Sequence, residues 1–288
     1  MMPVTALFMR LLIVAVPMAV HAGSARMELM VAPGIVAEAE YWPGEADLPA
    51  VLLLHGFLAT REFPTIHRLS EALAGEGFSV LAPTLSLGMS RRRQSVACEA
   101  IHTHSMEQDV AELRTWTRWL TERTGKAPVV IGHSVGGVQL TAMLDADRDL
   151  KIARAVLVSL SYFGEEQGPD EAGFLRARAT TDQTLAADAM YRYSLSYCKT
   201  YVTTPSNLLS YLKWDKERLM FALTGSEVPV TVIYGDRDER IDKGWIETLR
   251  TGRVAVRPVA GANHFFDLAH EFDLLDEVLS VITEGSHG

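Results

Sequence analysis

The chain has 288 residues, of which 48% are hydrophobic and 22% are charged, so it can bury a sizeable core and has the composition of an ordinary globular protein. Its formal net charge is −9. This acidic balance argues against nucleic acid or an anionic membrane surface as the main partner, because both require a basic protein surface.

The first residues have the pattern of a secretory signal peptide. Arg10 precedes an apolar run over residues 11–20, which is too short for a comfortable transmembrane helix. We expect residues 1–22 to be removed by cleavage after Ala22, with Ala25 as a second candidate. A membrane anchor that is never cleaved is the alternative. The expected location is the periplasm or the exterior of the cell, with no stable membrane span after cleavage.

Apolar patterning predicts the elements of the first half of the chain. Residues 26–42 alternate around a turn and are typical of a hairpin of edge strands, whereas the continuous apolar run at 51–54 is typical of a central parallel strand. The elements expected next are a helix over 64–74, a strand over 78–82, a loop over 83–101 and an amphipathic helix over 106–124.

The stretch Gly132-His133-Ser134-Val135-Gly136 lies between an apolar run at 127–131 and a helical pattern at 135–144. A strand that turns sharply into a helix, with serine at the apex, is a nucleophile elbow. Glycines flank the serine because a Cβ at either position would hold the strand and the helix apart. The pattern therefore predicts Ser134 as a nucleophile. The alternative is a glycine-rich turn whose serine only caps the helix.

After a buried strand expected over 153–160, the segment 162–225 interrupts the alternation of strands and helices. It has no clear strand pattern, but it has helix-like stretches near 170–179 and 208–223. The alternation then resumes with a strand over 228–234, a helix over 243–250, a strand over 253–259 and a helix over 267–283. We expect an α/β fold with a mainly parallel, doubly wound sheet built from residues 23–161 and 226–288, and a helical cap at 162–225 inserted after a core strand.

Four motifs in chain order resemble those of the α/β-hydrolase superfamily, in particular serine hydrolases of the esterase and lipase type with an inserted cap. They are Leu54–Phe57 after an early strand, the elbow, Tyr234–Asp238 after a late strand and Gly261–Phe265 after the last strand. Their order, Ser then Asp then His, is the order that this fold uses. The resemblance covers residues 51–283, and the cap matches only in placement.

This resemblance implies a catalytic triad of Ser134, Asp238 and His264. His264 follows the last strand, where the family places its base, and Asp238 satisfies the pattern Gly-x-x-Asp. Asp236 and Asp242 are the competitors for the acid, and we expect Asp236 to cap its turn.

The resemblance also implies an oxyanion hole. Its donors would be the backbone N–H groups of Val135 and Phe57, with Leu58 as the fallback for the second donor.

The predicted function is an exported serine hydrolase that cleaves a carboxylic ester or thioester of a small molecule through an acyl-enzyme, with no metal or organic cofactor. Amide, peptide or carbon–carbon bond hydrolysis and perhydrolysis remain open on the same fold. Two further alternatives are a non-catalytic binding protein on this fold and a secreted enzyme that degrades a polymer. The oligomeric state is not predicted.

For some residues outside these motifs, the sequence allows two interpretations of their role. Cys98 and Cys198 are either a disulfide that ties the cap to the core or two unpaired thiols. Arg91, Arg92 and Arg93 either recognise an anionic substrate group or form a solvated charged loop. The spacing of His102 and His104 is compatible with metal binding, but no further residues complete a recognisable metal site. The favoured interpretation is a histidine pair that lines the rim of the pocket. The aromatic residues of the cap either line an apolar pocket or pack the cap: Tyr191, Tyr193, Tyr197, Tyr211 and Trp214.

Overall fold

The computed structural model describes residues 23–166, 168–252, 254–267 and 269–284. The signal peptide predicted for residues 1–22 lies outside these ranges. Within them, no helix is long and apolar enough to cross a membrane.

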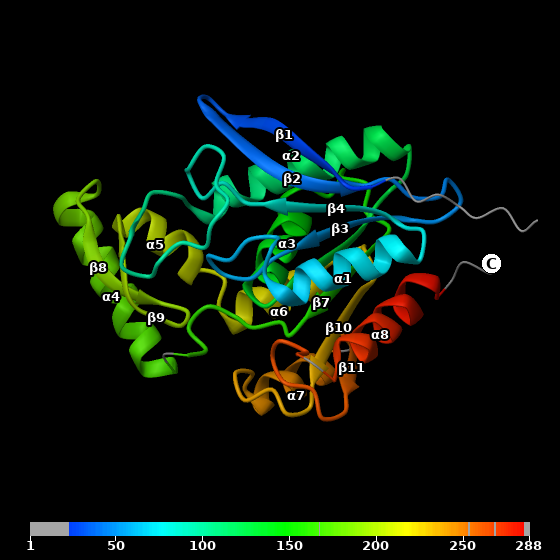
Figure 1. Ribbon diagram of the computed structural model, residues 1–288. Helices are drawn as coiled ribbons and strands as arrows, with labels where there is room; N and C mark the ends of the chain where they lie inside the picture. Colours follow the sequence, from blue (N-terminus) through cyan, green and yellow to red (C-terminus); the bar gives the residue numbers. More distant parts are fainter. Residues whose placement is uncertain (1–22, 167, 253, 268, 285–288) are drawn as a thin grey trace, which may run out of the picture.

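An eight-stranded sheet in the order β1-β2-β4-β3-β6-β7-β10-β11 forms the centre of the molecule (Figure 1). The first two strands and the β2–β4 pair are antiparallel, and every later pair is parallel. The strands are β1 (Ala25–Ala32), β2 (Ile35–Trp42), β3 (Ala50–Leu54), β4 (Ser79–Thr84), β6 (Val129–His133), β7 (Arg154–Val158), β10 (Val230–Gly235) and β11 (Ala255–Val259). The structure therefore confirms the mainly parallel sheet with an edge hairpin.

Helices cover both faces of this sheet, as predicted. On one face lie α1 (Pro64–Gly75) and α8 (Glu271–Thr283), and on the other lie α2 (Met106–Thr124), α3 (Val135–Ala146) and α7 (Lys243–Thr251) (Figure 1). The continuous apolar run of β3 contributes side chains to the hydrophobic cores on both faces of the sheet. Val51 and Leu53 pack with α1 and α8, whereas Leu52 and Leu54 pack with α2 and α3, because successive strand residues point to opposite faces.

Local sequence signals set the ends of α2. The Ser105 side chain accepts from the Gln108 backbone while the Gln108 side chain accepts from the Ser105 backbone, which is a complete capping box. The helix ends at Gly125, whose φ of 71° lies in the left-handed region that favours glycine. At α8 the prediction was less accurate, because the helix begins at Glu271 instead of residue 267.

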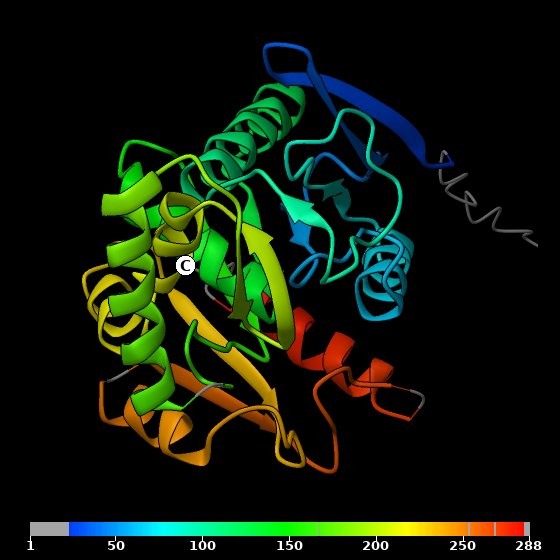
Figure 2. The same ribbon diagram turned by 90° about the vertical axis from the view of Figure 1, so that its left-hand side faces the viewer.

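A cap lies between β7 and β10, where an insertion was expected, but it is not entirely helical. Three helices, α4 (Pro169–Ala186), α5 (Pro205–Leu212) and α6 (Lys216–Thr224), accompany a hairpin of β8 (Tyr191–Leu195) and β9 (Cys198–Thr203). The short strand β5 (Ile101–His102) pairs with β9 and completes a second, three-stranded sheet. Figure 2, which faces the cap, shows this yellow-green hairpin beside the loop that follows β4.

The prediction of a helical cap was therefore incomplete, because the cap also contains two strands for which the sequence has no clear pattern. The two strands are only 5 and 6 residues long, and β9 pairs with a strand about a hundred positions away in the sequence. Such pairing is decided by tertiary packing, which a local pattern does not encode.

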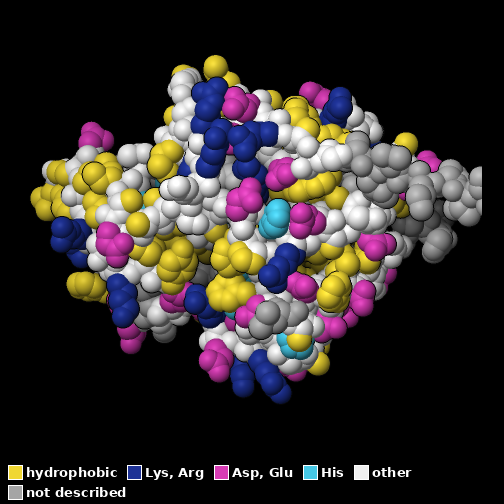
Figure 3. Space-filling view, viewed as in Figure 1, with side chains coloured by type: hydrophobic (Ala, Val, Ile, Leu, Met, Phe, Trp, Pro, Cys, Tyr) yellow, Lys and Arg dark blue, Asp and Glu magenta, His cyan; other side chains and the backbone are white. Residues whose placement is uncertain are grey.

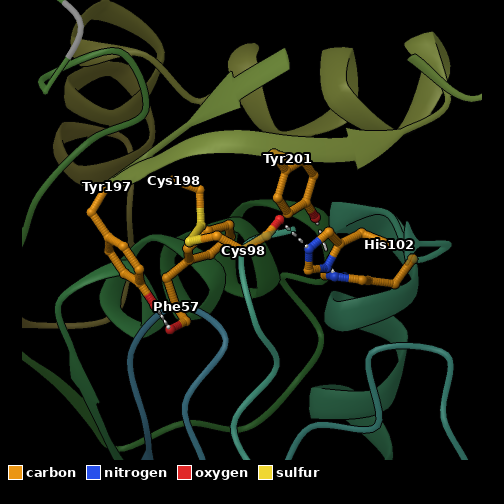
Figure 4. Close-up of a disulfide and its surroundings, with 7 residues drawn as sticks. Phe57, Cys98, His102, Tyr197, Cys198 and Tyr201 are labelled. Atoms are coloured by element: carbon orange, nitrogen blue, oxygen red, sulfur yellow. Dashed lines mark hydrogen bonds between the residues drawn. A yellow bond between two sulfur atoms is a disulfide. The ribbon is translucent and has the colours of Figure 1, made fainter. Parts of the chain in front are cut away.

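A disulfide bond joins Cys98 to Cys198 and so ties the loop after β4 to the cap hairpin (Figure 4). The structure confirms the disulfide, and not the two unpaired thiols, of the two interpretations given above. The bond closes a loop with a sequence separation of 100 residues. Closing so long a loop reduces the conformational entropy of the unfolded chain, which favours the folded state.

Candidate active site

Ser134 lies at the junction of β6 and α3 with a strained backbone, φ 55° and ψ −127°. A Cβ at Gly132 would lie 2.7 Å from the backbone carbon of Gly136, and a Cβ at Gly136 would lie 2.4 Å from the carbonyl oxygen of His55. Both distances are far inside van der Waals contact, so only glycine fits at these positions. The close approach expected from the sequence is present, and it presents Ser134 at the carboxyl end of β6.

Asp238 and His264 meet although they lie on different loops, after β10 and β11. His264 Nδ1 is 2.8 Å from Asp238 Oδ2, and because a carboxylate only accepts, this nitrogen carries the proton. The Arg240 backbone N–H donates to the other carboxylate oxygen at 2.9 Å. Burial alone would raise the pKa of Asp238, but the hydrogen bond and charge of His264 outweigh it and lower the pKa. The carboxylate is therefore ionised at neutral pH.

The two competing acids bind elsewhere. Asp236 accepts from the backbone N–H of Gly261 at 2.7 Å, so it joins the two loops instead of capping its own turn as expected. Asp242 caps α7 by accepting from the backbone N–H of Gly244. Neither side chain bonds to His264 within the described ranges.

Two further histidines bind backbone atoms around the elbow. His133 Nε2 donates to the carbonyl oxygen of His264 at 2.9 Å, and His55 Nδ1 donates to that of Gly56 at 2.8 Å. The other nitrogen of His55 accepts from the backbone N–H of Leu85. Burial lowers the pKa of His55 to about 3 and that of His133 to about 4, so both rings are neutral at physiological pH.

The residues predicted to form the oxyanion hole flank the serine. Val135 begins α3, and Phe57 lies on the loop 55–60 after β3, which we call the oxyanion loop. Within the described ranges, neither the N–H of Val135 nor that of Phe57 is used by a protein acceptor. Both groups are therefore free to donate to a ligand, which is what an oxyanion hole requires.

A cavity of about 260 Å³ opens at Ser134 and His264. Aromatic side chains form part of its wall, and polar groups from the cap and the loops complete it: Phe57, Phe63, Phe265, Tyr197, Ser95, Ser161, Ser196, Glu166 and Arg240. A larger groove of about 310 Å³ between α1 and α8 shares Phe63 and Phe265 with this cavity but contains none of the predicted triad residues. The chemistry therefore points to the smaller cavity.

Of the two interpretations of the arginine run, the solvated charged loop holds for Arg91 and Arg93, which are about half exposed, but not for Arg92. Arg92 is buried and donates to four backbone carbonyls, among them those of Ala59 at 2.7 Å and Leu85 at 2.6 Å. Arg91 and Arg93 pair with carboxylates of the edge hairpin, Glu28 and Glu38. Figure 3 shows basic and acidic side chains next to one another over this part of the surface. The run is a structural connection between the β1–β2 hairpin and the oxyanion loop.

The histidine pair is buried and does not line the pocket rim, so that prediction was wrong. The ring of His102 stacks on Tyr201 with centroids 3.9 Å apart, and His104 Nδ1 lies 3.2 Å from an oxygen of Asp109. No group of three or more possible metal ligands is arranged around an ion position in the described ranges.

One aromatic residue of the cap lies at the cavity, a position that the sequence pattern does not distinguish from those of the other cap aromatics. Tyr197 lines the cavity, whereas Tyr193, Tyr211 and Trp214 are buried in the packing of the cap. Tyr197 lies at the turn of the β8–β9 hairpin, which no local pattern identified. Glu166 and Arg240 were missed for the same kind of reason, because only the fold brings them to the serine.

The buried carboxyl group of Glu112 should make the stability of the fold depend on pH. Glu112 accepts from the backbone N–H of Ser86 at 2.9 Å, yet burial outweighs such bonds and raises its pKa from 4.5 to about 7. A carboxyl whose pKa is higher in the folded state stabilises the fold at low pH and loses that contribution as the pH rises between these two values. Relative to wild type, we expect the free energy of unfolding of Glu112→Gln to rise by about 3 kcal/mol between pH 4 and pH 8.

Urea unfolding at several pH values measures this difference. Glu122→Gln, on an exposed part of the same helix, is the control and should leave the pH profile of stability unchanged. A Glu112→Gln profile parallel to wild type would contradict the prediction.

A mainly parallel sheet, a serine at a strand–helix turn and an Asp–His pair beyond later strands define the class of α/β hydrolases. The sequence agrees with this architecture. Residues 51–277 match the model of the alpha/beta hydrolase family, which is more than half of the chain, and the protein belongs to that family. Family and fold together support hydrolysis as the class of reaction. No curated protein matches the chain.

Solved structures with the same fold include several enzymes. The thioesterase domain from the curacin biosynthetic pathway has a TM-score of 0.62 and 18% identity, over 91% of this chain and 99% of that one. Est1E from Butyrivibrio proteoclasticus, bound to ferulic acid, has a TM-score of 0.66 and 16% identity over 91% and 100%. A monoacylglycerol lipase from Paleococcus ferrophilus has a TM-score of 0.61 and 18% identity over 88% and 99%. Identities this low show a shared fold alone.

Proposed function

We propose that this protein is a serine hydrolase that cleaves a carboxylic ester or thioester of a small molecule. The observation that carries the proposal is the buried Asp238–His264 hydrogen bond of 2.8 Å beside a cavity that also contains Ser134. A serine hydroxyl is a weak nucleophile unless a base removes its proton during attack, and His264 lines the same cavity.

The proposed reaction has two steps. In acylation, Ser134 Oγ attacks the carbonyl carbon while His264 Nε2 takes the hydroxyl proton, and the leaving alcohol or thiol then receives that proton. In deacylation, His264 takes a proton from water, whose oxygen attacks the acyl-enzyme, and returns it to Ser134 Oγ as the acid leaves. Asp238 keeps the ring in the required tautomer and stabilises the imidazolium.

In both steps a negative charge develops on the former carbonyl oxygen. The N–H groups of Val135 and Phe57 would stabilise this charge, since both are free to donate.

The cavity supports a small substrate. Its volume of about 260 Å³ lies just below the usual range of small-molecule sites, roughly 300–1,000 Å³, and its aromatic walls suit a small apolar acyl or alcohol group. The fold neighbours named above include a thioesterase, an enzyme with bound ferulic acid and a lipase. These enzymes favour acyl transfer over the other chemistries of the fold.

Export from the cytoplasm belongs to the same proposal. The disulfide between Cys98 and Cys198 supports an oxidising compartment, because such bonds persist in the periplasm and outside the cell. The apolar pattern of residues 1–22 supports the same location.

A fluorophosphonate probe tests the proposed nucleophile. We expect wild type to be labelled, Ser134→Ala not to be labelled, and Ser161→Ala, which removes another serine from the same cavity, to keep its label. p-Nitrophenyl esters of increasing chain length, a thioester and an amide, assayed in parallel, then define the bond and the size of the acyl group. A folded wild-type protein that takes up no label would contradict the acyl-enzyme proposal and favour a non-catalytic binding protein.

A further inference from the structure

Hydrogen bonds from two separate parts of the chain hold the oxyanion loop. Its three consecutive carbonyl groups at residues 57–59 each accept at least one hydrogen bond. The loop after β4 supplies the backbone N–H of Val96 at 3.0 Å and the guanidinium of Arg92 at 2.7 Å. The cap supplies Tyr197, whose hydroxyl donates to the carbonyl oxygen of Phe57 at 3.1 Å (Figure 4).

The disulfide joins these two sources of hydrogen bonds. Cys98 lies two residues after Val96, and Cys198 directly follows Tyr197. In Figure 4 the tyrosine side chain extends from the end of the hairpin to Phe57, with the disulfide beside it. The covalent bond therefore keeps the turn of the cap hairpin next to the oxyanion loop.

From this arrangement we propose that Tyr197 is a positioning residue for the oxyanion hole and that the Cys98–Cys198 disulfide keeps it in place, so that opening the disulfide slows acylation. The inference rests on the proposed function, because it concerns the donor Phe57 of that reaction. Tyr197 does not touch the reacting atoms; its contact is with the carbonyl of the residue that donates.

The backbone of the loop explains why one hydrogen bond matters. The carbonyl of Phe57 shares a peptide plane with the N–H of Leu58, and Leu58 has a φ of 55°, which is unfavourable for a residue with a branched side chain. Loss of the bond from Tyr197 removes a restraint on this strained peptide, although the turn bond from the Ala59 N–H to the Gly56 carbonyl remains. The N–H of Phe57 belongs to the preceding peptide, which meets this one at the Cα of Phe57. A loop without the bond from Tyr197 therefore holds this N–H less firmly in the alignment that decides how much it stabilises the transition state.

The hydroxyl of Tyr197 can donate its hydrogen bond to the carbonyl of Phe57 at any pH in the neutral range. Although Tyr197 is 48% exposed, the partial burial of its hydroxyl raises the pKa of this group, so it keeps its proton throughout the neutral range. The ring also makes an edge contact with the ring of Phe57, with centroids 5.7 Å apart. Replacement by phenylalanine therefore removes the hydrogen bond and leaves the ring packing in place.

The first experiment compares Tyr197→Phe with Tyr191→Phe, a matched change in strand β8 of the same hairpin. For Tyr197→Phe we expect the rate of fluorophosphonate labelling and kcat for a p-nitrophenyl ester to fall about tenfold, as for the loss of one hydrogen bond, with KM within about twofold of wild type. Tyr191→Phe should match wild type in all three. A merely structural role would lower the melting temperature and leave the rate of the folded enzyme unchanged.

The second experiment addresses the disulfide. The double variant Cys98→Ser with Cys198→Ser should label about tenfold more slowly than wild type, and adding Tyr197→Phe should slow it little further, because both changes act through one contact. Mild reduction of the wild-type enzyme should produce the same fall, and reoxidation should restore the rate, which tests the idea even where the double variant folds poorly.

The outcomes separate the two proposals. Wild type that takes up no label contradicts the serine hydrolase itself. Wild type that labels, with Tyr197→Phe labelling equally fast, overturns the positioning role alone. A reduced enzyme that labels at the oxidised rate overturns the role of the disulfide.

Discussion

Asp238→Asn is expected to lower kcat by about 10⁴-fold in a protein that remains folded, as in triads where the same change reverses the tautomer of the histidine. The carboxylate accepts the proton on His264 Nδ1 across 2.8 Å. An asparagine amide that donates at this position would force the proton onto Nε2, the nitrogen that receives the proton of Ser134 in the proposed reaction. The lost charge would also leave the imidazolium without its counter-ion.

Steady-state kinetics with a p-nitrophenyl ester, together with circular dichroism, measures this effect. Asp236→Asn is the matched control on the same loop, and its amide oxygen can still accept from the N–H of Gly261. We expect it to retain activity within about threefold of wild type, since it leaves the Asp238–His264 bond intact. An inactive Asp236→Asn beside an active Asp238→Asn would transfer the role of the acid to Asp236.

Gly136→Ala is expected to have the largest effect on stability. The new Cβ would lie 2.4 Å from the carbonyl oxygen of His55 and 3.1 Å from that of Leu54, and backbone atoms cannot move aside as the end of a side chain can. Separating β3 from α3 disturbs the centre of the sheet and the start of the oxyanion loop. We expect the free energy of unfolding to fall by about 3 kcal/mol or more, at the upper end of overpacking effects.

Gly173→Ala supplies the comparison, because this residue lies within α4 and a Cβ there would meet nothing within 4 Å. It should leave stability unchanged or raise it by about 0.5–1 kcal/mol, as alanine favours a helix over glycine. Thermal or urea unfolding of both variants gives the comparison. Equal stabilities for the two would show that the elbow tolerates a side chain and that its glycines are not required by packing.

Sequence was sufficient for the central sheet and for the order of its motifs. Continuous apolar runs such as 51–54 are distinctive because parallel strands are buried on both faces. Apolar spacing also predicted the bounds of α2, 106–124, as the structure has them. The capping box at Ser105, which the structure shows there, is a short-range signal whose hydrogen bonds span only three residues. The elbow glycines could also be predicted from the sequence, since the close approach of strand and helix at the elbow permits no other residue.

The contacts around the oxyanion loop were decided only by tertiary structure. Sequence placed Arg92 in a charged run, Tyr197 among several cap aromatics and His102 at a pocket rim. The fold instead buries Arg92 against loop carbonyls, places Tyr197 on Phe57 and stacks His102 under the cap. These partners lie from about thirty to about a hundred and forty positions apart in the chain. Polar side chains take their roles from the groups that packing brings to them, and a one-dimensional pattern carries no record of that packing.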